Sequence, residues 1–183
     1  MYHISQDKRA QASALLLCHA LNELLLTRPF TDITVTDLQK AAAVGRTTFY
    51  RLFDNVSDVM VYQCDRLFEN TLKAHPNRLN TSPVELAEHF ISQILQEQAL
   101  LRAIMACGRP DFLLDAHRKY QEEAIAYFFP EDALTQRQKV VFNSIFAALL
   151  SIIVTPEAAD YSDSKAVLAD VRTTLKLVTQ MLA

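Results

Sequence analysis

The sequence predicts an all-α protein. Its 183 residues include only two glycines and six prolines, and the prolines lie between long runs without a helix-breaking residue. Within these runs, apolar residues recur three and four positions apart, as they do on the buried face of an amphipathic helix. A chain of this length can bury a core in one or two small domains.

Each expected helix has a start or stop signal in the sequence. Pro29 ends the first helix, and Thr135 caps a later one. Ser82, Pro83 and Glu85 supply a cap, an N1 proline and a capping-box carboxylate for a middle helix. The expected helices cover residues 5–27, 34–42, 46–53, 56–74, 83–96, 99–106, 111–129 and 135–154, with a last helix that Ser162 or Asp163 caps and that reaches Met181.

Residues 33–60 describe two short helices joined by a tight turn, followed by the start of a third helix. Thr34 caps the first helix, and Asp37 completes a capping box with it. Residues 43–45 form the turn. The second helix has apolar residues at i, i+3 and i+4, so one of its sides is buried. These apolar residues are Phe49, Leu52 and Phe53.

The other side of this second helix is polar. Its residues are Arg46, Thr47, Thr48, Tyr50 and Arg51. Core packing does not require hydroxyl and guanidinium groups there, whereas a helix in the DNA major groove uses them to contact bases and phosphates. The pattern therefore predicts that this helix reads DNA.

The segment resembles the N-terminal helix-turn-helix of TetR-type transcription regulators. The resemblance is strong over residues 8–60 and concerns only the helical layout beyond them. It implies a DNA-binding domain in residues 1–56 and an effector-binding and dimerisation domain in residues 57–183. The matching residues are Ile33, Thr34, Val35, Asp37, Leu38, Ala42, Val44, Arg46, Thr48, Phe49, Tyr50 and Phe53.

The resemblance also implies roles for particular side chains. The second helix reads bases, and the residue that matches Tyr50 contacts phosphate. The expected DNA-binding residues are Thr34, Thr36, Arg46, Thr47, Thr48, Tyr50 and Arg51.

Four positions depart from the family's usual motif. Ala43 replaces the turn glycine, and a left-handed residue with a Cβ costs about 1–2 kcal/mol. Gly45 replaces the serine cap, at a loss of roughly a few tenths of a kcal/mol. Leu52 stands in place of an aromatic residue or histidine, and Val56 in place of lysine. Two phosphate contacts are therefore missing, and we expect DNA binding to depend less on salt than is usual.

Composition adds little to this interpretation. The net charge is −3, and residues 1–56 are nearly neutral, so charge alone does not predict nucleic-acid binding. Cys18, Cys64 and Cys107 lack metal-ligand spacing. We interpret them as buried apolar residues in a reducing cytoplasm, with a redox-sensing thiol as the alternative.

Other chemistry is not indicated. The five histidines have no metal-ligand spacing, and the sequence contains no nucleotide-binding or nucleophile motif. We therefore expect that the protein binds no metal or cofactor and is not an enzyme. The most apolar stretch, residues 140–154, is too short to span a bilayer.

That same stretch predicts assembly. It is apolar on nearly every side, so we expect it to be buried on nearly every side, with a second subunit covering one flank. With the apolar stripe of the last helix it would form an intermolecular four-helix bundle. The alternative to this bundle is a core within one chain, with no dimer. A homodimer would read a palindromic operator in double-stranded DNA. The expected interface residues are Ile145, Leu149, Val167, Val171, Leu175 and Val178.

Aromatic residues of the middle helices predict an effector pocket between helices, oriented by a few polar groups. A plain core is the alternative interpretation. The expected pocket residues are Phe90, Ile94, Arg102, Phe112, His117, Tyr120, Phe142 and Phe146.

The resulting hypothesis is a cytoplasmic, homodimeric TetR-like regulator that a small-molecule effector controls. Repression is the family's usual outcome, and activation stays open. One alternative is a regulator whose C-terminal domain binds a protein partner. Another is a helical ligand-binding dimer that has lost DNA binding.

Overall fold

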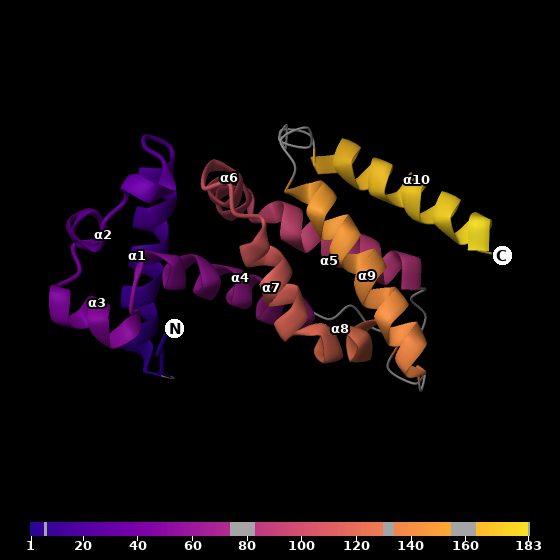
Figure 1. Cartoon of the computed structure of the whole chain (residues 1–183), viewed down its shortest axis with the longest axis horizontal. Helices are drawn as coiled ribbons and strands as arrows, with labels where there is room; N and C mark the ends of the chain where they lie inside the picture. Colours follow the sequence, from indigo (N-terminus) through magenta and orange to yellow (C-terminus); the bar gives the residue numbers. More distant parts are fainter. Residues whose placement is uncertain (6, 74–82, 130–133, 155–163, 183) are drawn as a thin grey trace. The chain divides into compact units, whose positions relative to one another are not determined.

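The computed structural model describes residues 1–5, 7–73, 83–129, 134–154 and 164–182, and these residues confirm the all-α fold (Figure 1). An isolated antiparallel bridge joins Tyr2 to Phe53. The elements are α1 (Lys8–Leu25), the short 3-10 helix η1 (Phe30–Asp32), α2 (Val35–Ala42), α3 (Arg46–Leu52), α4 (Val56–Lys73), α5 (Pro83–Gln96), α6 (Gln98–Ala106), α7 (Asp111–Lys119), α8 (Gln121–Phe128), α9 (Gln136–Ile153) and α10 (Ser164–Leu182).

The chain forms two compact units that do not follow chain order. Unit 1 comprises Met1–Arg66 together with Ala99–Leu113, and unit 2 comprises Leu67–Gln98 together with Leu114–Ala183. In unit 1, α1 packs against α2 and α3 (Figure 1). In unit 2, α5 packs against α8 and α10, and α8 packs against α9.

The helix-turn-helix forms as the sequence predicts. Thr34 caps α2 in a capping box with Asp37. Ala43 takes the left-handed conformation, with φ 52° and ψ 36°, although it carries a Cβ. Gly45 is the N-cap of α3, and because glycine has no side chain it cannot accept a hydrogen bond from the first N–H groups of the helix. The tight turn is therefore preserved without the usual glycine and serine.

Two predicted helix boundaries are wrong. The first helix spans Lys8–Leu25 rather than residues 5–27. It begins at Lys8 because the N-cap Asp7 has an extended backbone and its side chain accepts a hydrogen bond from the Arg9 N–H. The single helix predicted over residues 111–129 is interrupted at Tyr120, where φ is −102° and ψ is 17°. Neither proline nor glycine lies at this break. The Tyr120 ring stacks on Phe68, so a tertiary contact occupies the point where the helix ends.

We expect residues 140–154 to be buried on nearly every side only when a second subunit covers one flank, and the single chain covers only part of this stretch. Phe146, Leu149, Leu150 and Ile153 are buried, but Val140, Val141 and Ile152 expose 55%, 54% and 46% of their surface. The helix is amphipathic within unit 2, and its second apolar face stays open. The caps predicted at Ser162 and Asp163 lie outside the described residues.

The cysteines behave as apolar residues. Cys18 and Cys64 are buried, and Cys107 is half-buried. Burial raises the pKa of the Cys18 thiol to about 12 and also raises the pKa values of Cys64 and Cys107. Thiols held in the protonated form are poor nucleophiles, which favours the packing interpretation. Among the described residues, no helix is long and apolar enough to cross a membrane.

Candidate nucleic-acid interface

The start of α2 is fixed by reciprocal hydrogen bonds. Thr34 Oγ1 accepts from the Asp37 N–H at 3.2 Å, and Asp37 Oδ2 accepts from the Thr34 N–H at 3.0 Å and the Thr34 hydroxyl at 2.6 Å. Arg28 Nη1 lies 3.4 Å from Asp37 Oδ1. Hydrogen bonds from Thr34, and then the charge of Arg28, hold the pKa of Asp37 below its usual value. Thr36 is exposed in the first turn of this fixed helix.

Helix α3 turns its polar side outward. Phe49 and Leu52 are almost completely buried, which anchors the opposite side of the helix. Thr48 is half-buried. The exposed residues of α3 are Arg46, Thr47, Tyr50 and Arg51. The structure thus brings the predicted base-reading and phosphate-contacting residues onto one short helix.

The ring of Tyr50 is held by two neighbours. The Arg46 guanidinium lies 5.3 Å from the ring centroid, within cation–π range. The Phe49 ring packs edge-on against the Tyr50 ring, with 5.4 Å between the two ring centroids. Tyr50 nevertheless keeps 45% of its surface exposed. Its ring is therefore held by contacts on α3 itself while the residue stays accessible.

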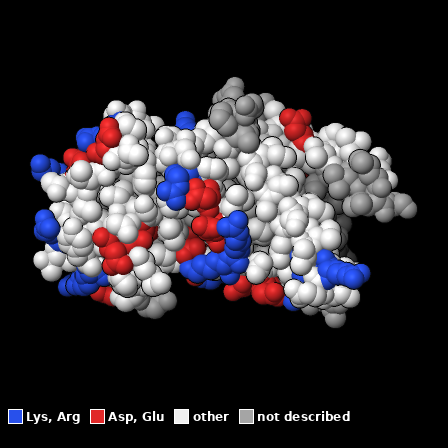
Figure 2. Space-filling model, viewed as in Figure 1, with Lys and Arg blue, Asp and Glu red and all other residues white. Residues whose placement is uncertain are grey.

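The guanidinium groups of α3 are available for a ligand. Among the described residues, neither Arg46 nor Arg51 forms an ion pair with a carboxylate. Figure 2 shows basic side chains, with acidic ones between them, along the edge of unit 1 where α2 and α3 lie. This surface is of mixed charge, in agreement with the nearly neutral composition of residues 1–56.

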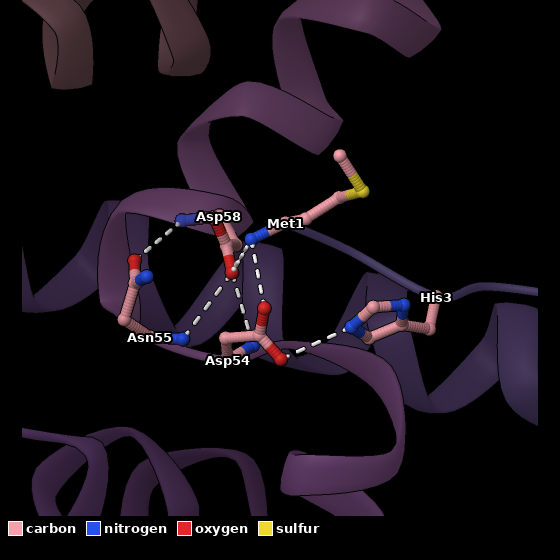
Figure 3. Close-up of polar contacts among 5 residues, drawn as sticks. All are labelled: Met1, His3, Asp54, Asn55 and Asp58. Carbon is pink, nitrogen blue, oxygen red and sulfur yellow. Dashed lines mark hydrogen bonds and ion pairs between the residues drawn. The ribbon is translucent and has the colours of Figure 1, made fainter.

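The junction of α3 and α4 contains polar groups that sequence reasoning missed (Figure 3). Asn55 caps α4, because its Oδ1 accepts from the Asp58 N–H at 3.1 Å and its own N–H donates to Asp58 Oδ2 at 3.3 Å. This cap was expected at Asn55 or Asp54. The Met1 ammonium and His3 also contact this junction. The sequence does not predict these contacts, because Met1 and His3 are more than 50 positions away from Asp54 and Asp58 along the chain.

Unit 2 contains a cluster of aromatic rings. Phe146 packs on Phe90 and on His117, with centroid distances of 5.0 Å in both pairs. Phe68 and Tyr120 are stacked at 6.2 Å with an interplanar angle of 9°. Six of the eight predicted pocket residues lie in unit 2, and five of these are rings of this cluster. The six are Phe90, Ile94, His117, Tyr120, Phe142 and Phe146.

The other two predicted pocket residues lie in unit 1. Arg102 is exposed on α6. Phe112 is buried, with its ring edge-on to Phe30 at 6.2 Å. The eight predicted pocket residues are therefore divided between the two units, and whether a ligand binds near them stays a prediction.

His117 is a buried polar group within the aromatic cluster. Its Nε2 lies 3.2 Å from the backbone oxygen of Asn143. Because a carbonyl only accepts, Nε2 carries the hydrogen and Nδ1 is left as an acceptor. Among the described residues, His117 Nδ1 and Asn143 Oδ1 are buried acceptors without a donor. Burial lowers the pKa of His117 and keeps the ring neutral at pH 7.

The predicted interface residues fall into three groups. Leu149 and Val171 are buried within the chain. Ile145 and Val167 are half-buried. The side chains of Leu175 and Val178 lie outside the described residues.

Comparisons with known proteins identify the fold. No protein-family model matches the chain, and no curated protein sequence matches it. The structure of Lin0861 from Listeria innocua matches with a TM-score of 0.71 at 16% identity, covering 99% of this chain and 96% of that one. A TetR transcriptional regulator from Streptococcus agalactiae 2603V matches with a TM-score of 0.56 at 21% identity, covering 91% and 97%.

A third solved structure, the TetR family repressor AlkX from Dietzia sp. strain DQ12-45-1b, matches with a TM-score of 0.50 at 19% identity. It covers 89% of this chain and 95% of that one. The identities are low, so the likeness is one of fold. The chain has a TetR-like fold over nearly its whole length.

Proposed function

We propose that the protein is a sequence-specific DNA-binding transcription regulator that reads its operator with α3. One observation carries the proposal: α3 is anchored by Phe49 and Leu52 and exposes two guanidinium groups that pair with no carboxylate among the described residues. The TetR-like fold supports the same conclusion.

The dimensions of α3 fit this role. Seven residues at about 1.5 Å each make a helix of about 10 Å. With side chains an α-helix is about 10–12 Å across, so the major groove of B-DNA, about 12 Å wide, admits α3 along the groove. Arg46 and Arg51, at opposite ends of α3, can then reach base edges or the flanking phosphates, and Tyr50 contacts phosphate.

Operator binding by α3 variants tests the proposal. Arg51→Ala should weaken binding to DNA from the promoter of the chain's own gene by about 1–3 kcal/mol and relax the preference at one position of each half-site. Tyr50→Phe should weaken all sequences alike. Arg137→Ala, which removes an exposed arginine from α9, is the matched control. Unchanged fluorescence anisotropy titrations for both α3 variants would exclude this assignment.

A homodimer is the second part of the proposal. The open face of α9 carries Val141, Ala148 and Ile152, spaced as a helix–helix seam requires. An apolar face of this kind is stabilised when a second subunit covers it. Leu149 and Val171, which the sequence also assigned to the interface, are already buried in the chain, so the exposed residues of α9 carry the proposal.

Sedimentation measures this assembly. Ile152→Asp should give a folded monomer, because Ile152 is exposed in the single chain and its charge is buried only in the dimer. Leu16→Asp, at an exposed apolar position on α1 of unit 1, should remain a dimer. A wild-type chain that sediments as a monomer at micromolar concentration would exclude the proposal.

The third part is control by a small molecule that binds within unit 2. The cluster around His117 supports an apolar, ring-containing effector, because the surrounding side chains are aromatic. The two buried acceptors, His117 Nδ1 and Asn143 Oδ1, favour an effector that donates hydrogen bonds through an N–H or O–H group. Whether such an effector strengthens or weakens operator binding follows from its relative affinity for the DNA-bound form.

Paired probes test this ligand class. Indole, which has an N–H donor, should raise the melting temperature more than benzothiophene, which has the same shape without the donor. His117→Phe keeps a ring in the cluster but removes one of the two acceptors, and it should reduce the difference between the two probes. Equal shifts in the wild-type chain would exclude the donor requirement.

A further inference from the structure

The first three residues cross the junction between α3 and α4 (Figure 3). Tyr2 forms an antiparallel bridge with Phe53, and the His3 N–H donates to the carbonyl oxygen of Leu52 at 2.8 Å. His3 Nε2 lies 3.0 Å from Asp54 Oδ1. Met1–His3 therefore lies alongside the last residue of α3 and the loop that leads to α4.

The ammonium group of Met1 joins two carboxylates at this junction. It donates to Asp54 Oδ2 at 2.9 Å and to Asp58 Oδ2 at 2.8 Å. The Asp58 side chain is only 10% exposed, and it also accepts the N–H groups of Asp54 and Asn55. A carboxylate with so little solvent needs such compensation. Hydrogen bonds to Asp58 and Asp54 accordingly raise the pKa of the ammonium, and the same contact lowers the pKa of Asp54.

Tyr2 extends the contact along α4. Its hydroxyl donates to Asp65 Oδ2 at 2.6 Å, and Asp65 is 2% exposed. Its ring packs edge-on against Tyr62 at 5.2 Å. Asp58 and Asp65 are seven residues apart, about two turns of helix, so the segment contacts the first turns of α4 as well as the end of α3.

We propose that Met1–His3 is a positioning strap that fixes α3 on α4 and neutralises Asp54 and Asp58 beside the DNA. The inference rests on the proposed function, since it requires α3 in the major groove. With its side chains an α-helix is about 10–12 Å across, so in a major groove about 12 Å wide it is flanked by the phosphates of both strands. Asp54 lies two residues beyond the end of α3, so its unneutralised charge would repel them.

The strap therefore has two separable effects. Loss of the Tyr2 contacts would loosen α3 on α4, which lowers both thermal stability and operator affinity at any salt concentration. Loss of the Met1 charge would leave the Asp54 carboxylate facing phosphate, and this repulsion is strongest at low salt because ions screen it.

An N-terminal extension separates these effects. Gly-Ser-Gly placed before Met1 moves the ammonium away and should weaken operator binding roughly two- to five-fold at low salt, and less at high salt. Asp54→Asn in the extended chain should restore affinity, because it removes the charge that the ammonium neutralised. Tyr2→Phe should lower the melting temperature and weaken binding equally at both salt concentrations, and Asp54→Asn should not restore it.

The outcomes distinguish the strap from the proposed function. If the wild-type chain binds the operator, and the extended chain and Tyr2→Phe both bind it equally well at both salt concentrations, the strap has no role. If affinity falls but Asp54→Asn does not restore it, the charge-neutralising role is overturned. If the wild-type chain shows no sequence preference, the proposed function fails, and the proposal falls with it.

Discussion

The two units of this protein are built by different kinds of interaction. In unit 1, short helices are set by hydrogen bonds at their ends: Asp7, Thr34 and Asn55 each bond to a backbone N–H within three residues. In unit 2, aromatic rings from several helices pack on one another around Phe90 and Phe146. Unit 1 thus owes much of its shape to local chemistry, and unit 2 to contacts between distant segments.

This difference explains why the two units differ in what their sequence reveals. A cap or a turn occupies a fixed spacing along the chain, so it can be recognised without knowing the fold. An aromatic residue at helical spacing indicates burial but not its partner. The exposed side of α3, which we propose reads DNA, can therefore be recognised from the sequence, whereas the packing partners of the aromatic residues in unit 2 cannot.

The largest expected effects come from removing one buried ring from each unit. Phe49→Ala and Phe90→Ala should each lower the free energy of unfolding by about 3–5 kcal/mol. Phe49 also anchors α3, so its loss should weaken operator binding by the chains that remain folded. Phe90→Ala should leave that binding unchanged. Denaturant unfolding and anisotropy titration of the same samples measure both quantities, and equal losses of operator affinity would contradict this division.

The capping boxes give a matched pair of smaller effects. Thr34→Ala in unit 1 and Thr135→Ala in unit 2 each remove the hydroxyl that accepts an N3 backbone N–H. Each should cost about 1 kcal/mol of stability. Only Thr34→Ala should also weaken operator binding, because α2 packs against α3. A Thr135→Ala variant that loses operator affinity to the same extent would argue against a role confined to unit 1.

The smallest effect concerns the turn. Ala43→Gly should stabilise the protein by about 0.5–1 kcal/mol, because the relief of the left-handed strain exceeds the entropy that glycine loses on folding. Ala41→Gly is the matched control, since Ala41 is exposed in the regular part of α2. It should destabilise by about 0.5–1 kcal/mol. Thermal unfolding in which both glycines shift the melting temperature in the same direction would show that the turn is not strained.

Much of the helix-turn-helix was predictable from sequence. The capping box of Thr34, the left-handed Ala43 and the exposed side of α3 are each encoded within a few residues. The break at Tyr120 was not predictable, because no proline, glycine or cap marks it. The strap could not be predicted either: its hydrogen bonds join residues 49 to 63 positions apart, and no spacing rule covers such pairs.

Enrichment of operator sequences from a randomised pool of duplex DNA tests the central claim most directly. With the wild-type chain, we predict one enriched motif made of two half-sites related by a two-fold axis, since a dimer presents two copies of α3. With Arg51→Ala, we predict that the same motif returns with one position of each half-site relaxed. A wild-type chain that enriches no sequence and binds all duplexes equally would contradict the account and favour a helical ligand-binding protein that has lost DNA binding.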